Sequence, residues 1–221
     1  MKSLLLALLL AGSTFAQDAK RGPLAPLISS VDRHYNALRT LQCNFTEHYS
    51  GNGIERNESG TLLLKKPGRM RWNYEQPRVK LFVSDGKTAW FYVPGDRQAR
   101  KSPAKELDDL RSPLRYLLGK TRLEKELEGL TFASDVPPMA PNDVLLRGRP
   151  KAMADQVQDV VLEINPAGQI VRLAIHSTDG STTEFGFSNI RENAPLADSE
   201  FMFSPPPGVE VITSKDITAP Q

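Results

Sequence analysis

Histidine is the side chain best suited to proton transfer and metal binding near neutral pH, and the chain holds three, His34, His48 and His176. None of them lies at a diagnostic spacing from a second ligand or a nucleophile. Gly-x-Ser-x-Gly, Walker and zinc-protease motifs are absent, and Gly51-Asn52-Gly53 fails as a dinucleotide loop because Arg56 stands where a third glycine is needed. We therefore expect no enzyme activity, no metal site and no cofactor.

Other reactive or charged residues have simpler interpretations. The single cysteine, Cys43, cannot form an internal disulfide, and beside Phe45 it is expected to be a small buried hydrophobe. The basic run from Lys65 to Arg71 alternates cations with apolar residues around a Pro-Gly turn, which favours outward strand positions over nucleic-acid binding. The formal net charge is +2 with both signs interspersed, so the charge indicates neither a nucleic-acid partner nor a polybasic membrane patch.

The first residues have the pattern of an export signal. Lys2 supplies the positive start, Leu4–Ala11 the apolar core and Thr14-Phe15-Ala16 the cleavage site, so we expect the exported chain to start near Gln17. The apolar core is about eight to ten residues long, against the roughly 20 that cross a bilayer. A lipid-attachment cysteine would follow the Leu-Ala-Gly stretch, where Ser13 stands. We expect a soluble periplasmic protein without its own lipid anchor.

Two helical regions are expected within a single domain of residues 17–221. Apolar residues recur at helical spacing over about residues 25 to 41, which predicts one amphipathic helix. A leucine-rich interlude then predicts two short helices, at about 104–111 and 113–118. Ser112-Pro113 forms the N-cap and first-turn pair of the second one.

From Phe45 onward the pattern changes to strands. Tight turns are indicated at Gly51-Asn52-Gly53, Ser84-Asp85-Gly86-Lys87, Asn165-Pro166-Ala167-Gly168 and Thr178-Asp179-Gly180. Such short connections favour an antiparallel meander, since parallel strands need long crossovers. After a Pro-rich loop the strands resume at Val144 and run to Ile190, and a last strand is expected near Phe201–Phe203. About ten to eleven strands result.

The alternation within these strands predicts an apolar cavity. Met70, Trp72 and Tyr74 share one face of their strand. A later strand has the same pattern in Val160 and Leu162, so each strand is expected to have a single apolar face. A closed barrel of eight strands is just filled by its side chains. A larger curved sheet is therefore expected to enclose a concave apolar cavity, with the helices across its mouth.

Four blocks of sequence, in the right order, resemble the periplasmic outer-membrane lipoprotein carrier family, LolA. They are Phe45-Thr46-Glu47, the stretch from Gly60 to Pro77 that contains Lys65-Lys66-Pro67-Gly68, the stretch from Val83 to Pro94, and the stretch from Phe201 to Val209. The two middle blocks are specific, whereas the region from 120 to 155 matches only in kind. The resemblance implies a mainly β fold, an unclosed antiparallel barrel whose mouth is covered by a lid of short helices.

The resemblance also implies a function and partners. LolA-type carriers take lipoproteins from the inner-membrane ABC transporter LolCDE and pass them to the outer-membrane receptor LolB. We expect a monomeric carrier with the same partners. The hypothesised acyl-chain wall comprises Leu62, Leu64, Met70, Trp72, Tyr74, Phe82, Trp90 and Tyr92, and the hypothesised lid plug comprises Leu114, Leu117 and Leu118. Both faces of the strands with Phe82 and Trp90 are partly apolar, so their orientation stays open.

Lys66 stands where the family usually has an arginine that holds the lid through backbone carbonyls. Because lysine lacks the five-donor guanidinium fork, the resemblance implies a weaker or different anchoring of the lid here.

Two other functions remain open from the sequence. The same fold could carry another hydrophobic ligand, such as a glycolipid or a pigment, and no residue excludes it. A lipid hydrolase would need a polar catalytic cluster inside the apolar cavity, which the histidines and serines do not supply. A receptor of the LolB kind would need the missing lipid-attachment cysteine.

Overall fold

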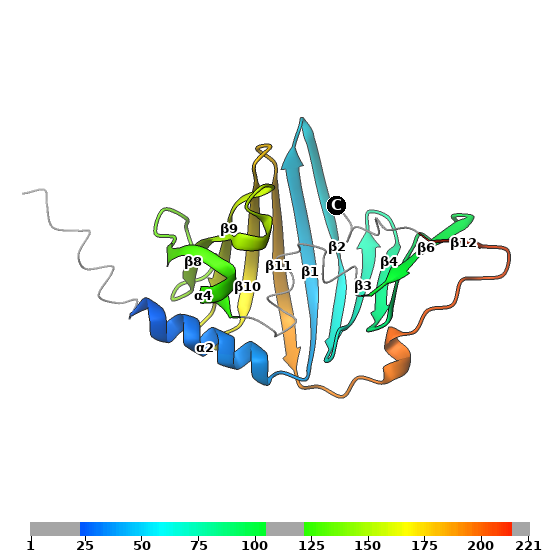
Figure 1. The fold of residues 1–221 in the computed structure, drawn as a ribbon, viewed down its shortest axis with the longest axis horizontal. Helices are drawn as coiled ribbons and strands as arrows, with labels where there is room; N and C mark the ends of the chain where they lie inside the picture. Colours follow the sequence, from blue (N-terminus) through cyan, green and yellow to red (C-terminus); the bar gives the residue numbers. More distant parts are fainter. Residues whose placement is uncertain (1–22, 105–121, 214–221) are drawn as a thin grey trace, which may run out of the picture.

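The computed structural model describes residues 23–104 and 122–213, which form one curved sheet with a helix across one end (Figure 1). The helices are α2 (Leu24–Ala37) and the short α4 (Leu123–Glu126), with single 3-10 turns η2 (Lys151–Met153) and η3 (Asp198–Phe201). The strands are β1 (Thr40–Gly51), β2 (Ile54–Lys65), β3 (Arg69–Gln76), β4 (Lys80–Asp85), β5 (Thr88–Tyr92), β6 (Gln98–Pro103), β7 (Leu127–Phe132), β8 (Val144–Pro150), β9 (Val157–Ile164), β10 (Ile170–Ser177), β11 (Thr182–Glu192) and β12 (Glu210–Thr213).

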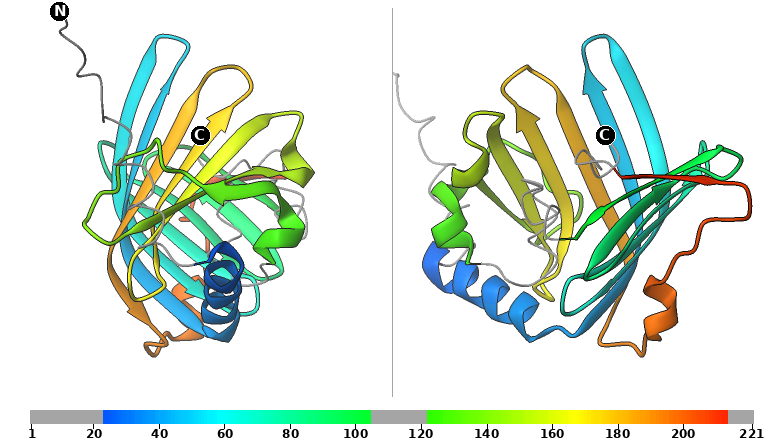
Figure 2. Two further views of the ribbon diagram at one scale, coloured as in Figure 1. Left: turned by 90° about the vertical axis from the view of Figure 1, so that its left-hand side faces the viewer. Right: turned by 45° about the vertical axis from the view of Figure 1, so that its right-hand side comes forward.

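The described strands pair in the order β12-β6-β5-β4-β3-β2-β1-β11-β10-β9-β8-β7. Every pair is antiparallel except β12 with β6, which is parallel. The sheet has two free edges, β12 and β7, and curls into a half-barrel (Figure 2). The expected unclosed barrel is therefore confirmed. The described residues contain twelve strands, one or two more than expected, and β7 lies before Val144, where the strands were expected to resume.

The turns lie where the sequence places them. The β1–β2 hairpin closes on Asn52 and Gly53, with φ angles of 53° and 74°. Two successive positive φ values are the requirement of a type I′ turn, whose twist matches the flanking strands. The turns between β4 and β5, β9 and β10, and β10 and β11 are also confirmed.

The first helix is shorter than expected, since α2 ends at Ala37. Leu38 is already extended, with φ −64° and ψ 140°, and β1 begins at Thr40. Leu41 keeps helical spacing with the residues before it, but it also alternates with Cys43 on the buried side of β1. Leu41 therefore fits both the helical spacing of three to four residues and the strand spacing of two, so the sequence pattern extended the predicted helix too far.

Two further expectations were wrong. Not every strand has a single apolar face: Val161, on β9, points away from the main core and packs with Leu145 and Ala174 in a second cluster. Residues Phe201–Phe203 do not form a strand. Phe201 ends η3, and the last strand lies further on, at β12.

Candidate functional site: the concave face of the sheet

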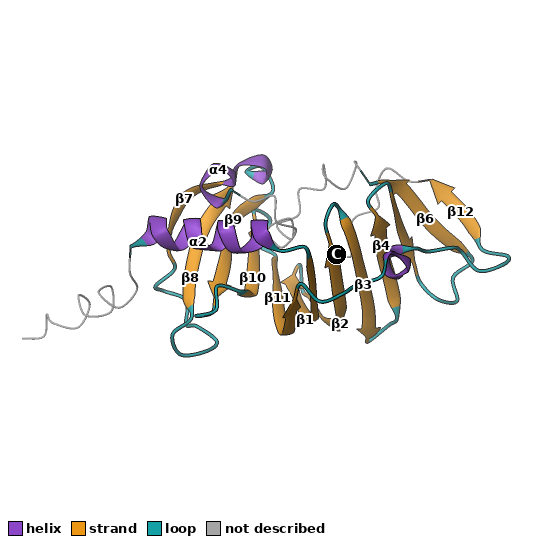
Figure 3. Cartoon of the chain, turned by 90° about the horizontal axis from the view of Figure 1, so that it is seen from below, coloured by secondary structure: helices purple, strands orange, loops and turns teal. Residues whose placement is uncertain are grey.

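The concave face of the half-barrel is built from rows of apolar side chains that run across the strands. Cys43, Leu62, Trp72, Phe82 and Phe91 are successive cross-strand partners from β1 to β5. Directly opposed residues of a sheet share one face, so these five form one continuous row. The same face packs against α2 at one end of the sheet (Figure 3).

Aromatic rings make up the centre of this face. The Phe45 ring meets Trp72 at a centroid distance of 4.8 Å and Tyr74 at 4.9 Å, both edge-on. Trp72 also meets Phe185 of β11 at 6.0 Å. These contacts join strands on both sides of β1, and edge-to-face geometry adds to the stabilisation from burial.

Helix α2 closes one end of the concave face. Its residues Ile28, Val31 and Tyr35 are buried against the core. The Ile170 amide of β10 donates a 2.7 Å hydrogen bond to the Tyr35 hydroxyl oxygen. The helix is therefore anchored to the sheet by both apolar contact and a buried hydrogen bond.

Six of the eight residues expected to form the acyl-chain wall lie on this face: Leu62, Leu64, Met70, Trp72, Tyr74 and Phe82. Trp90 and Tyr92 do not. The pairing of Phe82 with Phe91 places Phe91 on the concave side, and alternation then turns Trp90 and Tyr92 outward. The sequence missed Phe91, because β5 is apolar on both faces. Whether these side chains contact an acyl chain stays a prediction.

A C-terminal segment, residues 194–209, covers the outer face of β2 to β5 and explains why Trp90 and Tyr92 are apolar. Both rings lie 5.5 Å from the ring of Phe203. Phe201 is almost fully buried, at 1% exposure. The segment crosses the convex side of the sheet on its way to β12 (Figure 2). Trp90 and Tyr92 therefore belong to an outer packing layer.

Charged side chains hold the same segment in place. Lys65 Nζ lies 2.6 Å from Asp198 Oδ1, and Arg69 Nη1 lies 3.1 Å from the same oxygen. Arg71 Nη1 donates a 3.0 Å hydrogen bond to the Glu200 carbonyl oxygen. The side-chain hydrogen bond from Lys65 holds the pKa of Asp198 below its usual range. Three cations of the basic run, Lys65, Arg69 and Arg71, thus bind the chain's own C-terminal segment.

Beyond the aromatic centre the concave face becomes polar. Glu47 is the partner of Glu58, and Lys80 the partner of Tyr74, so all four lie on this face. The Tyr74 hydroxyl donates a 2.9 Å hydrogen bond to Glu47 Oε2. Lys80 Nζ donates to both Glu58 oxygens, at 2.6 and 2.7 Å. Arg56 lies 3.8 Å from Glu47 and 3.5 Å from Glu58. We call these five residues the polar row.

Burial dominates the ionisation of the polar row. Desolvation raises the pKa of Glu47 to about 7, against the lowering effects of the Tyr74 hydrogen bond and the nearby cations. Desolvation and the Glu47 carboxylate raise the pKa of the Tyr74 hydroxyl, which stays protonated and is a donor. Burial likewise raises the pKa of the Cys43 thiol to about 12, which makes it an unreactive core residue.

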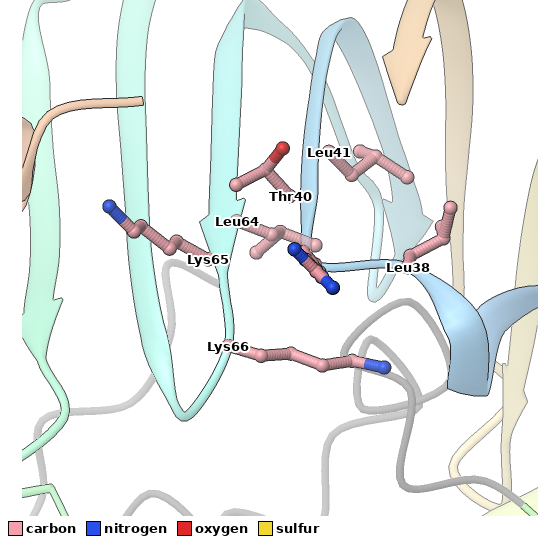
Figure 4. Close-up of a pocket in the computed structure, with 7 residues that line it drawn as sticks. Leu38, Thr40, Leu41, Leu64, Lys65 and Lys66 are labelled. Carbon is pink, nitrogen blue, oxygen red and sulfur yellow. The ribbon is translucent and has the colours of Figure 1, made fainter. Parts of the chain in front are cut away.

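Lys66 holds the end of helix α2. Its Nζ donates hydrogen bonds of 2.8 Å to the Tyr35 carbonyl and 2.9 Å to the Asn36 carbonyl. A small pocket beside it, with a volume of about 10 Å³, lies between the end of the helix, β1 and β2 (Figure 4). That volume suits a single water molecule and no larger ligand.

The three histidines lie apart from one another, His34 on helix α2, His48 on β1 and His176 on β10, and each has its own partner. His34 pairs with Glu192 at 2.8 Å, His48 with Asn57 at 2.7 Å, and His176 with Asp159 at 2.7 Å. Within residues 23–104 and 122–213 no group of three or more histidine, cysteine or acidic residues is placed to hold a metal ion. No helix in these same ranges has the length and hydropathy needed to span a membrane.

Several expectations concern residues outside the described ranges. These are the export signal, the helices at 104–111 and 113–118, and the lid residues Leu114, Leu117 and Leu118. Their roles stay predictions, as does the role of Lys66 in holding a lid.

The fold and the apolar concave face define an open-barrel binding protein for apolar molecules. The model of the family "Outer membrane lipoprotein carrier protein LolA" matches residues 36–204, and the chain belongs to this family. Relatives named outer-membrane lipoprotein carrier protein occur in Dechloromonas aromatica, at 31% identity over 86% of this chain and 90% of the relative. Another, in Xanthomonas campestris pv. campestris, is 30% identical over 92% of this chain and 94% of the relative.

Solved structures share the fold at low sequence identity. An uncharacterised conserved protein from Thermus thermophilus aligns with a TM-score of 0.55 and 13% identity, covering 86% of this chain and 98% of that one. The Mycobacterium tuberculosis lipoprotein LppX aligns with a TM-score of 0.51 and 12% identity, covering 79% of this chain and 99% of that one. These likenesses concern the fold alone.

Proposed function

We propose that this protein carries lipoproteins across the periplasm, with their acyl chains held against the concave face of the sheet. The continuous apolar row from Cys43 to Phe91 is the observation that carries the proposal. Membership of the LolA family and the names of the relatives support it.

The physical need for such a carrier is the cost of exposing acyl chains to water. Burial of hydrocarbon contributes about 0.8 kcal/mol per methylene, so a protein with several acyl chains does not cross an aqueous compartment unaided. A carrier whose apolar face is already covered when empty exchanges one burial for another. The net affinity is then a small difference, and cargo can be handed on without an energy source in the periplasm.

The proposed partners are an inner-membrane ABC transporter of the LolCDE type, which loads the carrier, and an outer-membrane receptor of the LolB type, which unloads it. The test incubates purified protein and ATP with membranes that bear the transporter and a labelled lipoprotein. We expect the label in a soluble one-to-one complex. If the label stays in the membrane while a known carrier releases it, the proposal is wrong.

A carrier of another hydrophobic ligand is the alternative within the same fold. Mass spectrometry of lipids extracted from the protein purified from its own periplasm separates the two. Acylated peptides support lipoprotein transport, whereas a single class of non-peptide lipid favours the alternative.

A further inference from the structure

The concave face is divided along the strands into an apolar part and a polar part. On β1 the inward side chains run in the order Leu41, Cys43, Phe45 and Glu47, starting from the end that adjoins α2. Glu47 follows Leu41 by six positions along the strand, which corresponds to roughly 20 Å. The division gives the face a direction, with hydrocarbon at the α2 end and charge toward the β1–β2 hairpin.

Part of the polar row is internally satisfied. Both oxygens of Glu58 accept hydrogen bonds from Lys80, and Glu47 Oε2 accepts one from Tyr74. The Lys80 ammonium also lies 4.3 Å from the centre of the Tyr74 ring. These contacts fix Glu58, Lys80 and Tyr74 as a scaffold, and a ligand is not needed to complete them.

Glu47 and Arg56 differ, because they keep polar atoms that are buried without a hydrogen bond. Glu47 Oε1, Arg56 Nε and Arg56 Nη2 have no hydrogen-bond partner among the described residues. Glu47 is 1% exposed. The 3.8 Å between Glu47 Oε1 and Arg56 Nη2 is an ion-pair distance but too long for a hydrogen bond. A buried unsatisfied polar group costs free energy, so each such atom needs an explanation.

The three atoms present a defined set of hydrogen-bonding groups, one acceptor and two donors. We propose that Glu47 and Arg56 bind the amide and ester groups that link the acyl chains of the cargo to its polypeptide. An amide N–H donates to Glu47 Oε1, and ester carbonyls accept from Arg56 Nε and Nη2. The acyl chains then extend from the polar row along Phe45 and Trp72 toward α2. This inference rests on the proposed function and adds an orientation to it.

The hydrophobic surroundings favour such a linkage group over a fully charged head group. The Arg56 guanidinium lies 5.2 Å from the centre of the Tyr49 ring, so an aromatic face borders it. When Glu47 is ionised, the two carboxylates and two cations of the polar row balance in charge. A neutral ligand with both donors and acceptors fits a balanced site, whereas a phosphate or an ammonium group would leave one charge without a partner.

The test uses two synthetic lipopeptides that differ only in this linkage. One carries an N-acyl chain and two ester-linked chains, and the other carries ether-linked chains, which lack the glycerol carbonyls. Affinities are measured for the full protein, Arg56→Gln, Arg56→Lys and the control Arg97→Gln, whose exposed side chain lies in the β5–β6 turn at the same end of the sheet. Circular dichroism checks that each variant is folded.

We expect Arg56→Gln to weaken binding of the ester lipopeptide about tenfold, the scale of one or two lost hydrogen bonds from a charged donor. Arg56→Lys should also weaken it, because lysine lacks the fork. Binding of the ether lipopeptide should change less than about twofold. Equal loss for both lipopeptides, or no loss for either, overturns the inference. A wild-type protein that binds neither overturns the proposed function as well.

A phospholipid with two ester-linked chains distinguishes the source of the carbonyl groups. If Arg56→Gln weakens phospholipid binding and leaves the lipopeptide unaffected, the site serves a different lipid and the inference as stated is wrong. Orientation is tested by photo-crosslinking with a diazirine at the linkage or at a chain terminus. The linkage probe should label residues 47–58, and the terminal probe should label residues near α2. The reverse pattern contradicts the proposed orientation.

Discussion

Lys66 Nζ lies 2.8 Å from the Tyr35 carbonyl oxygen and 2.9 Å from that of Asn36, so the β2–β3 turn is tied to the last turn of helix α2. The last carbonyls of a helix have no partner within the helix, and a cation is favourable there. The tie holds the helix across the end of the concave face.

Replacing Lys66 by Met should therefore loosen α2. We expect a loss of about 1–2 kcal/mol in the free energy of unfolding, the scale of two partly exposed hydrogen bonds from a charged donor. Urea denaturation measures it. Lys87→Met, at an exposed turn position, is the matched control, and an equal effect of both changes would show that the helix contacts are unimportant.

Glu47 should make stability depend on pH. Its pKa is raised from 4.5 to about 7 by burial, so between these values the folded protein holds a proton that the unfolded chain has released. Stability due to this group is therefore present below about pH 4.5 and is lost as the pH rises through about 7, by about 3 kcal/mol in all.

Glu47→Gln tests this dependence. Urea unfolding at pH 5 and pH 7.5 should show a smaller decrease for Glu47→Gln than for the wild type. Glu55→Gln removes an exposed carboxylate nearby and should leave the decrease unchanged. An identical decrease in the free energy of unfolding in all three proteins would contradict the burial of a titrating Glu47.

The two tryptophans report on opposite faces of the sheet. Trp72 lies on the concave face, and Trp90 packs on Phe203 outside. Bromine quenches indole fluorescence only at short range. A lipopeptide with brominated acyl chains should therefore quench Trp90→Phe, which retains Trp72, and should leave Trp72→Phe almost unquenched.

The unbrominated lipopeptide is the control for this fluorescence experiment. Stronger quenching of Trp90 than of Trp72 would place the chains on the convex side, against the proposed function.

Gly60 allows β2 and β3 to approach closely at a bulge. A Cβ atom at this position would overlap the Asn73 carbonyl oxygen, so the backbone would have to move. We expect Gly60→Ala to destabilise the fold by about 3 kcal/mol. Thermal or urea unfolding measures the effect, with Ser59→Ala as the neighbouring control. A change below about 1 kcal/mol would show that the bulge adapts.

Local sequence alone determined most of the strands, because side-chain alternation and turn chemistry act over a few residues. Asn52-Gly53 defined the β1–β2 hairpin, and the alternation of Met70, Trp72 and Tyr74 defined the inward face of β3. The family also followed from the sequence, since three of its four blocks lie within the strands β1 to β5 and the turns between them.

Only the tertiary structure decided what depends on distant contacts. The pairing of β1 with β11, and of β12 with β6, joins segments far apart in the chain. The sequence did not decide which face of β5 points inward, because both faces are apolar. The contact of Trp90 with Phe203 places Trp90 in the outer packing layer. The polar row likewise needed β1, β2, β3 and β4 to lie side by side. Such contacts depend on the register between strands, which no local pattern contains.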